Sequence, residues 1–176
     1  MTLVRVVRTY LELRTPETLR SSTSDHPALR LVRESPGNVE LFRQLYRDVG
    51  ATYHWRDRNA LTDDELRALL GSPHVQLWVL YEKETPAGFF ELCRHADRSV
   101  EIAYLGLSAA YFGRGLGKHL LTAAARAAWA FDAERVWLHT CTLDSPAALP
   151  NYIARGFEPY RVETYETRVE DPAPAA

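Results

Sequence analysis

The chain has 176 residues, of which 46% are hydrophobic and 25% charged, a balance typical of one globular domain with a buried core. A net charge of −2, a pI near 6.3 and scattered arginines argue against nucleic-acid binding. Two cysteines outside any CxxC pair exclude a disulfide framework and suit a reducing compartment. The sequence contains neither a signal-peptide pattern nor an apolar run of membrane-spanning length, so we expect a cytoplasmic protein without membrane contact.

The first half of the sequence predicts two strands and then two helices. Residues 3–13 alternate in the manner of a strand, and after a polar connection residues 28–34 predict a second, short strand. Asn38 precedes apolar residues at helical spacing, which predicts a helix capped by this asparagine. Thr62 and Glu65 have the spacing of a capping box, which predicts the start of the next helix.

The second half predicts a three-stranded antiparallel meander followed by a strand–helix–strand unit. Residues rich in β-branched and aromatic types, separated by short turns, form the meander at 75–82, 86–95 and 99–107. A long alanine-rich helix leads from the third of these strands to an apolar strand at 135–141, and a right-handed crossover makes those two strands parallel. A short helix and a last strand complete the order. We therefore expect a mixed α+β fold in which helices flank a mostly antiparallel sheet.

Three glycines within five positions mark the stretch YFGRGLGKHLL at residues 111–121. Where a loop enters a helix, backbone N–H groups and the helix dipole favour phosphate, although a plain tight turn would also use glycine. A Walker A loop counted back from Gly117 and Lys118 would require a glycine at Phe112, and His119 replaces its Ser/Thr. The spacing also fails the GxGxxG pattern, so neither nucleotide motif applies.

The same loop resembles the Q/R-x-x-G-x-G/A motif of the GCN5-related N-acetyltransferase (GNAT) superfamily. Gly115 and Gly117 match its two glycine positions, whereas Phe112 stands where Gln or Arg is usual. VEIAYLGL before the loop is similar to the family's fourth strand, and AALPNYIARGF after it to the family's fourth helix and the start of its last hairpin. The order of elements matches the family from about residue 28 to residue 168.

This resemblance implies the GNAT fold, with a sheet that splays between the family's fourth and fifth strands. We expect an acetyltransferase domain over residues 28–170 and a disordered tail over 171–176. The N-terminal strand and its connection, residues 1–27, lie outside the family pattern. A monomer or a homodimer is expected.

The resemblance also implies acetyl-CoA as the cosubstrate, with no metal. In the family, backbone amides of the glycine loop hold the pyrophosphate, and the strand before it offers backbone partners to pantetheine. The amide of Leu105 or Leu107 is the implied oxyanion donor, and Arg114 is placed to add charge. The full set of implied cofactor-binding residues is Leu105, Gly106, Leu107, Phe112, Gly113, Arg114, Gly115, Leu116, Gly117, Lys118 and Tyr152.

Direct acetyl transfer requires a neutral amine and a proton for the departing thiolate. The resemblance places Tyr152 where its phenol serves as the acid, although a tyrosine packed on the sheet fits the sequence too. Glu101 matches the base of histone-acetylating members, and Glu91 and His139 are further candidates. Each of these three is alternatively a hydrogen-bonded structural group.

The acceptor is expected to meet the loop GATYHWRDRNAL between the two predicted helices. Tyr53, His54, Trp55 and Arg58 either line a pocket for a small amine or belong to a solvated loop that Trp55 anchors in the core. The expected function is acetyl transfer from acetyl-CoA to a primary amine of a small molecule or peptide. The alternative is a non-catalytic acyl-CoA-binding domain. Asp144 is expected to cap the short helix that follows it.

Overall fold

The computed structural model describes residues 2–169. The helices and strands alternate in the order β1 (Thr2–Leu13), β2 (Leu29–Arg33), α1 (Val39–Gly50), α2 (Asp63–Leu70), β3 (Val75–Glu82), β4 (Thr85–Arg94), β5 (Ser99–Leu107), α3 (Leu116–Ala130), β6 (Arg135–Cys141), α4 (Ala148–Ala154) and β7 (Glu158–Val169). Short 3₁₀ turns connect some of them, including two between α1 and α2. No helix in this described range is long and apolar enough to cross a bilayer.

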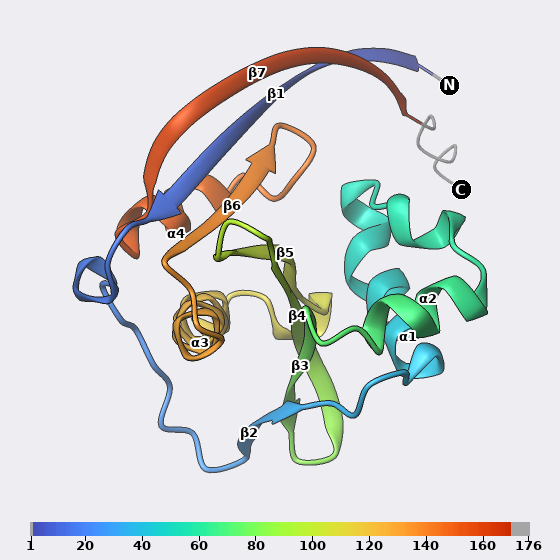
Figure 1. Ribbon diagram of the computed structural model, residues 1–176, viewed down its shortest axis with the longest axis vertical. Coiled ribbons are helices and arrows are strands. Elements are labelled where there is room, and N and C mark those ends of the chain that lie inside the picture. The colour runs from blue at the N-terminus through green and yellow to red at the C-terminus, as the bar shows by residue number, and fades with distance from the viewer. Residues whose placement is uncertain (1, 170–176) are drawn as a thin grey trace.

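All the strands form one mixed sheet in the order β2-β3-β4-β5-β6-β1-β7. Every neighbouring pair is antiparallel except β5 and β6, which are parallel across the α3 crossover. Figure 1 shows α1 and α2 on one side of β3–β5 and α3 on the other, while β1 and β7 curve together away from them. The expected α+β fold and the parallel crossover are thus confirmed.

The sheet splays where β5 and β6 separate. In the described sheet these strands pair only between Ser99–Glu101 and Arg135–Trp137. Beyond that point β5 carries a bulge, because Leu92 of β4 is opposite Ile102 but Glu91 is opposite Tyr104, which leaves Ala103 as an extra residue. A bulge bends its strand and increases the local twist, so the end of β5 turns away from β6.

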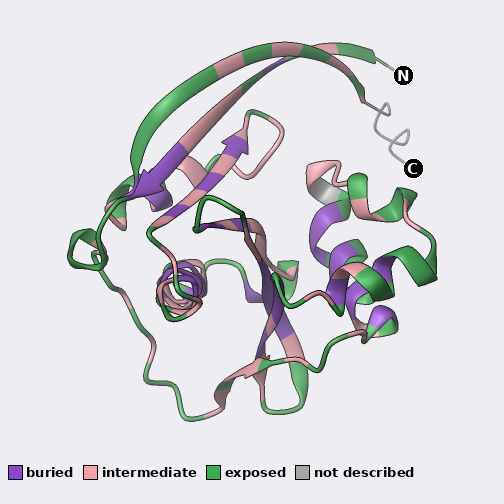
Figure 2. Cartoon of the chain, in the orientation of Figure 1, coloured by how far each residue is buried: buried purple, intermediate pink, exposed green. Residues whose placement is uncertain are grey.

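The N-terminal strand is an interior strand of the same sheet, although residues 1–27 lie outside the family pattern. β1 inserts between β6 and β7, with Leu11 opposite Leu138 and Leu13 opposite Val136. Both leucines are fully buried in the core cluster beneath α3, and Figure 2 shows this end of β1 as buried. The packing therefore joins β1 to the rest of the sheet and its core.

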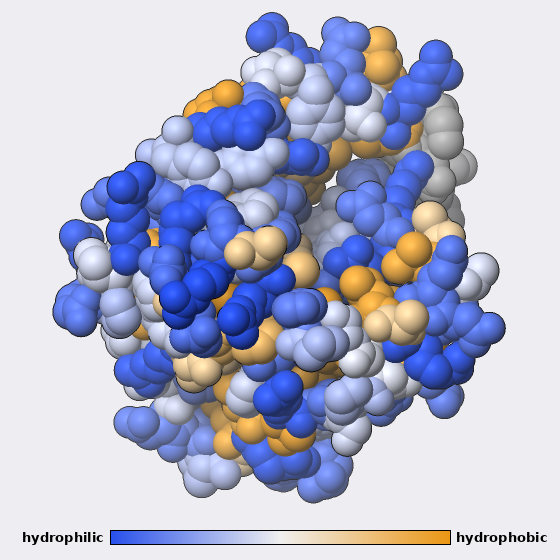
Figure 3. All heavy atoms as spheres, viewed as in Figure 1, coloured by the Kyte–Doolittle hydropathy of each residue, from blue (hydrophilic) through white to orange (hydrophobic). Residues whose placement is uncertain are grey.

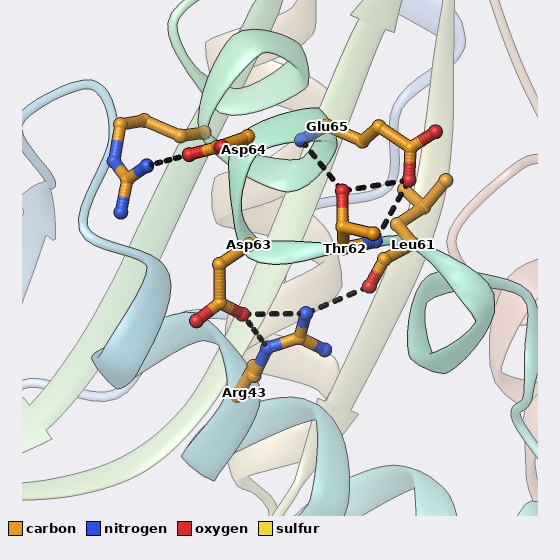
Figure 4. A network of polar contacts seen from close by, with 7 residues as sticks. Arg43, Leu61, Thr62, Asp63, Asp64 and Glu65 are labelled. Atoms are coloured by element: carbon orange, nitrogen blue, oxygen red, sulfur yellow. Dashed lines mark hydrogen bonds and ion pairs between the residues drawn. The ribbon is translucent and has the colours of Figure 1, made fainter.

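The start of α2 has the capping box that the sequence predicts. The Glu65 amide donates to Thr62 Oγ1 at 3.3 Å, and Glu65 Oε2 accepts from the Thr62 amide at 2.8 Å (Figure 4). Arg43 of α1 donates to Asp63 Oδ1 at 2.7 Å and to the Leu61 carbonyl at 2.8 Å. These bonds fix the end of the loop that connects the two helices.

Candidate active site

A cavity of about 1170 Å³ opens beside the splay. It is lined by the end of β5, the glycine loop and first turn of α3, β6, α4, the segment from residue 53 to residue 58, and the facing sides of β1 and β7. Figure 3 shows the surface hollowed between the β1/β7 pair and the helices α1 and α2. Residues 2–169 contain no group of three or more His, Cys, Asp or Glu side chains arranged to hold a metal ion.

The glycine loop presents free backbone to this cavity. Gly113 and Gly115 have φ values of +73° and +74°, a conformation that other residues adopt only with strain. Nothing lies within 4 Å of a Cβ added to either glycine, so the space beside them is open. Gly115 is the N-cap of α3, and no side chain caps the helix, which leaves its first amides without a partner. The positive φ also explains Gly113, where the family frame asks for no glycine.

The side chains of the loop divide between the cavity and the surface beside it. Arg114 does not line the cavity, because its guanidinium turns to the end of β3 and forms an ion pair with Glu82. The expected contact of Arg114 with the cofactor therefore lacks a geometric basis in this conformation. Phe112 has extended backbone, is 50% exposed and lines the cavity, as does Lys118.

The backbone of Leu105, Gly106 and Leu107 lines the cavity from the β5 side. These residues pair with β4 on one edge, and the other edge faces the gap that the splay opens. Gly106 permits this arrangement, because a Cβ there would lie 2.4 Å from Val49 Cγ1 of α1. Free amide and carbonyl groups thus point into a water-accessible gap.

Tyr152 of α4 also lies at this gap. Its side chain is 8% exposed and packs against Phe157, and its hydroxyl has no hydrogen-bond partner among the described residues. Burial, reinforced by the negative charge of Asp144, raises the pKa of this phenol. The phenol is protonated at neutral pH even at its ordinary pKa of 10, burial reinforces that state, and Tyr152 lines the cavity.

Glu101 and His139 both line the cavity on one face of the sheet, the face of Trp137. Glu101 Oε2 lies 3.0 Å from His95 Nε2. The His139 ring packs against Tyr10 and has no hydrogen-bond partner among residues 2–169. Burial, aided by the nearby Arg8 guanidinium, lowers the pKa of His139, so its neutral imidazole can accept a proton.

Glu91 occupies a different environment from the other two base candidates. It is fully buried on β4, does not line the cavity and accepts a hydrogen bond from Arg58 Nη2 at 2.6 Å. Burial raises the pKa of the Glu91 carboxyl, and the Arg58 guanidinium opposes that rise. Glu91 thus lacks access to a substrate proton and instead holds Arg58 in place.

The expected acceptor residues Tyr53, His54, Trp55 and Arg58 all line the cavity. Trp55 is also anchored in the core, with its ring 5.0 Å from that of Tyr104. Gly50 makes this packing possible, because a Cβ there would lie 2.6 Å from the indole. The pocket and the anchored tryptophan, which the sequence leaves as alternatives, are therefore both present.

Sequence reasoning missed the wall formed by β1 and β7, which brings Arg8 and Tyr165 to the cavity. These residues are far apart in the sequence and belong to no motif, so only the β1/β7 register could have indicated them. Asp144 also differs from expectation. It does not cap α4, because its Oδ2 accepts from Thr140 Oγ1 at 2.7 Å and from the Cys141 amide at 2.8 Å, and so stabilises the turn after β6.

Known structures share this splayed α+β architecture at low sequence identity. A GCN5-related N-acetyltransferase from Kribbella flavida has 17% identity and a TM-score of 0.64, with 93% of this chain and 58% of that chain covered. One from Sphaerobacter thermophilus has 14% identity and a TM-score of 0.68, over 94% and 52% of the two chains. An aminoglycoside acetyltransferase from an uncultured soil metagenomic sample, in complex with trehalose, has 19% identity and a TM-score of 0.62, over 75% and 90%.

The fold and the site thus define an α+β domain with an open helix N-terminus beside a splayed sheet. The sequence pattern of the Acetyltransferase (GNAT) family matches residues 40–157, and the chain belongs to this family. It spans 58% and 52% of the lengths of the Kribbella and Sphaerobacter chains. No curated protein is similar enough in sequence to count as a relative.

Proposed function

We propose that the protein is an acetyl-CoA-dependent N-acetyltransferase that acetylates a primary amine of a small molecule or peptide directly. The observation that carries this proposal is that one continuous cavity reaches both the uncapped first turn of α3 and the side chains of Tyr152, His139 and Glu101. A covalent enzyme intermediate is unnecessary when both substrates occupy one site.

The cavity residues suit acetyl-CoA, which supplies the acetyl group as a thioester. The amides of α3 and the open space at Gly113 and Gly115 fit a pyrophosphate, whose negative charge the helix dipole favours. The unpaired backbone edge at Leu105–Leu107 fits an extended amide-containing arm. The Leu105 or Leu107 amide is also available to stabilise an oxyanion.

The side chains then divide the proton transfers. His139, with a neutral imidazole, accepts a proton from the acceptor ammonium, and Glu101 on the same face favours binding of that cation. Tyr152 donates its phenolic proton to the sulfur as the C–S bond breaks, since burial keeps this hydroxyl protonated. The new bond joins the amine nitrogen to the acetyl carbon as the carbon–sulfur bond breaks, and the surplus proton on that nitrogen restores the Tyr152 phenol, so the products are the amide, the CoA thiol and the proton held by His139.

Two measurements on purified protein test this function. Acetyl-CoA at about 100 times its Kd should stabilise the protein by about 2.7 kcal/mol, which raises the melting temperature by roughly 5–11 °C. A panel of primary amines should then release CoA, and Tyr152→Phe should lower kcat by about 10²- to 10⁴-fold, far more than it lowers the acetyl-CoA shift. Tyr160→Phe is the matched control, because Tyr160 is 43% exposed on β7 and outside the cavity lining.

The outcomes separate this proposal from a non-catalytic acyl-CoA-binding domain. Stabilisation by acetyl-CoA without CoA release from any amine would favour the binding domain. Equal loss of activity in Tyr152→Phe and Tyr160→Phe would contradict the role given to the buried phenol. Absence of any thermal shift would overturn the acetyl-CoA assignment itself.

A further inference from the structure

The three strands β6, β1 and β7 at one end of the sheet place an arginine on the same sheet face as His139. Arg8 of β1 is directly opposite Cys141 of β6, and Tyr10 is opposite His139, so Arg8 and His139 leave the sheet on one side. Both residues line the cavity. The alternation of β1 therefore brings a guanidinium to the part of the cavity where the proton acceptor lies.

No ion pair within residues 2–169 neutralises Arg8, and Glu163, directly opposite it on β7, is bound instead to Arg161 and Tyr10. Arg8 Nη2 donates to Tyr165 Oη at 3.0 Å, and the guanidinium carbon lies 4.8 Å from the centre of that ring. Arg8 Nε is buried without a hydrogen bond, and no carboxylate within residues 2–169 forms an ion pair with this side chain. Arg58, which lines the cavity from the segment between α1 and α2, differs because Glu91 neutralises it.

An arginine in this state is suited to bind an anion from the cavity. The guanidinium stays charged at every physiological pH and offers a planar set of donors that matches a carboxylate. A buried donor without a partner is unfavourable, and a ligand that supplies the acceptor removes this cost. The Tyr165 hydroxyl accepts from one nitrogen of the Arg8 guanidinium and so restricts the orientation of the other two.

The cavity also contains acidic groups. Asp57 and Glu101 both line it, and Asp57 Oδ2 lies 3.4 Å from Tyr104 Oη as a hydrogen-bond acceptor. A cavity that offers carboxylates and an unmatched guanidinium complements a ligand that carries both an ammonium and an anionic group. Carboxylates alone would have suited an acceptor with amines only.

We propose that the acceptor is an amino acid or peptide whose free carboxylate binds Arg8 and Tyr165, while its amine faces His139. This inference rests on the proposed acetyltransferase function and specifies its substrate class. Arg8 and His139 are two strand positions apart in register, about 7 Å along β6, so one small molecule can reach both.

Matched acceptors test the proposal through CoA release. The panel contains α- and ω-amino acids and short peptides with free C-termini, each beside its carboxamide, which removes the charge at nearly constant shape. The wild-type protein should prefer carboxylates at least tenfold in kcat/KM. Arg8→Gln should lower kcat/KM for carboxylates by about 10- to 100-fold and leave carboxamides within about twofold, while Arg8→Lys restores part of the preference. Free amino acids and peptides form separate arms of the panel.

A matched control and a binding measurement keep the proposal testable. Arg5→Gln removes one positive charge from the same strand, where Arg5 is exposed, three residues from Arg8 and so on the opposite face of the sheet, and outside the cavity lining. It should leave the carboxylate preference unchanged. Calorimetry with N-acetylated amino acids and their amides measures the role of Arg8 without turnover, and circular dichroism verifies that each variant folds.

The two levels of the proposal fail differently. If acetyl-CoA neither binds nor releases CoA, the acetyltransferase function fails, and calorimetry still reports whether Arg8 selects carboxylates. If amines are acetylated but carboxylates and carboxamides react equally, or Arg8→Gln weakens both equally, the substrate class is wrong while the function stands. Equal effects of Arg8→Gln and Arg5→Gln would reduce the role of Arg8 to general surface charge.

Discussion

Gly117→Ala separates the stability of α3 from its role in ligand binding. Gly117 lies in the first turn of α3, with no positive φ, and the nearest atom to an added Cβ is Asn151 Nδ2 at 4.0 Å. The methyl group therefore touches Asn151 without a clash, in a residue that lines the cavity. We expect a more stable protein that still binds acetyl-CoA, because the family motif accepts alanine at this position.

The size of both effects follows from this geometry. Alanine is favoured over glycine in a helix interior by about 0.8–1.0 kcal/mol, and in the first turn we expect about half of that or more. A gain of about 0.5–1 kcal/mol raises the melting temperature of a chain of this size by roughly 1–4 °C. Acetyl-CoA binding should stay within about twofold of wild type, because the α3 amides remain free and the motif Q/R-x-x-G-x-G/A accepts alanine at this position.

Melting curves with and without acetyl-CoA measure both effects in one experiment. Gly37→Ala is the control, because Gly37 has a φ of +88° and lies outside the cavity lining. It should lose about 1 kcal/mol of stability from backbone strain and keep the full acetyl-CoA shift. A Gly117→Ala protein that is less stable, or that loses the acetyl-CoA shift, would refute the reasoning about the α3 turn.

Three further results are expected. Glu91→Leu should lower the free energy of unfolding by about 3 kcal/mol, because Arg58 loses its buried partner, and the double variant Glu91→Leu with Arg58→Met should recover most of this loss. Urea denaturation measures both variants, and a free energy of unfolding for Glu91→Leu within about 0.5 kcal/mol of wild type would contradict the pairing. The pKa of His139 is lowered below its usual 6.5, so kcat should rise as the pH rises through a value below 6.5 and should level off above it. His139→Gln should remove this rise in kcat. A rise in the wild-type kcat centred above about pH 7.5 would indicate another base. Burial likewise lowers the pKa of His119, whose Nδ1 accepts from the Ser24 amide at 3.1 Å. As the pH falls below 6.5, the unfolded chain takes up a proton that the folded chain does not, so the free energy of unfolding falls. Hydrogen exchange, corrected for its intrinsic pH dependence, should show the Ser24 amide losing protection, whereas unchanged protection at pH 5 would argue against this bond.

Local sequence signals account for most of the fold. The capping box at Thr62 and the cap at Asn38 both form, because these motifs depend on residues three apart in the chain. The parallel pairing of β5 and β6 follows from the crossover rule. The glycine loop could be predicted from the sequence for the same reason, because the positive φ of Gly113 and Gly115 is a local requirement of the backbone.

Contacts between distant segments account for what the sequence did not reveal. Arg114 looked available to a ligand, but the end of β3 brings Glu82 to it. In the sequence Glu91 cannot be distinguished from the other candidate bases, because the loop after α1 that places Arg58 against it is distant in the chain. The wall with Arg8 depends on pairing of the first strand with the last, which no periodicity encodes. The Asp144 carboxylate accepts from the Cys141 amide of its own turn instead of capping the helix that follows.

The pairing of β1 with β7 also sets an order of assembly. Thr2 is opposite Val169, so these strands close a loop of nearly the whole described chain, the entropically slowest kind of contact to form. The meander and α3 involve short separations and can form while the last strand is still absent. The surface that carries Arg8 and Tyr165 is therefore expected to be completed last. A folding intermediate would already possess the α3 turn and yet lack the wall opposite it.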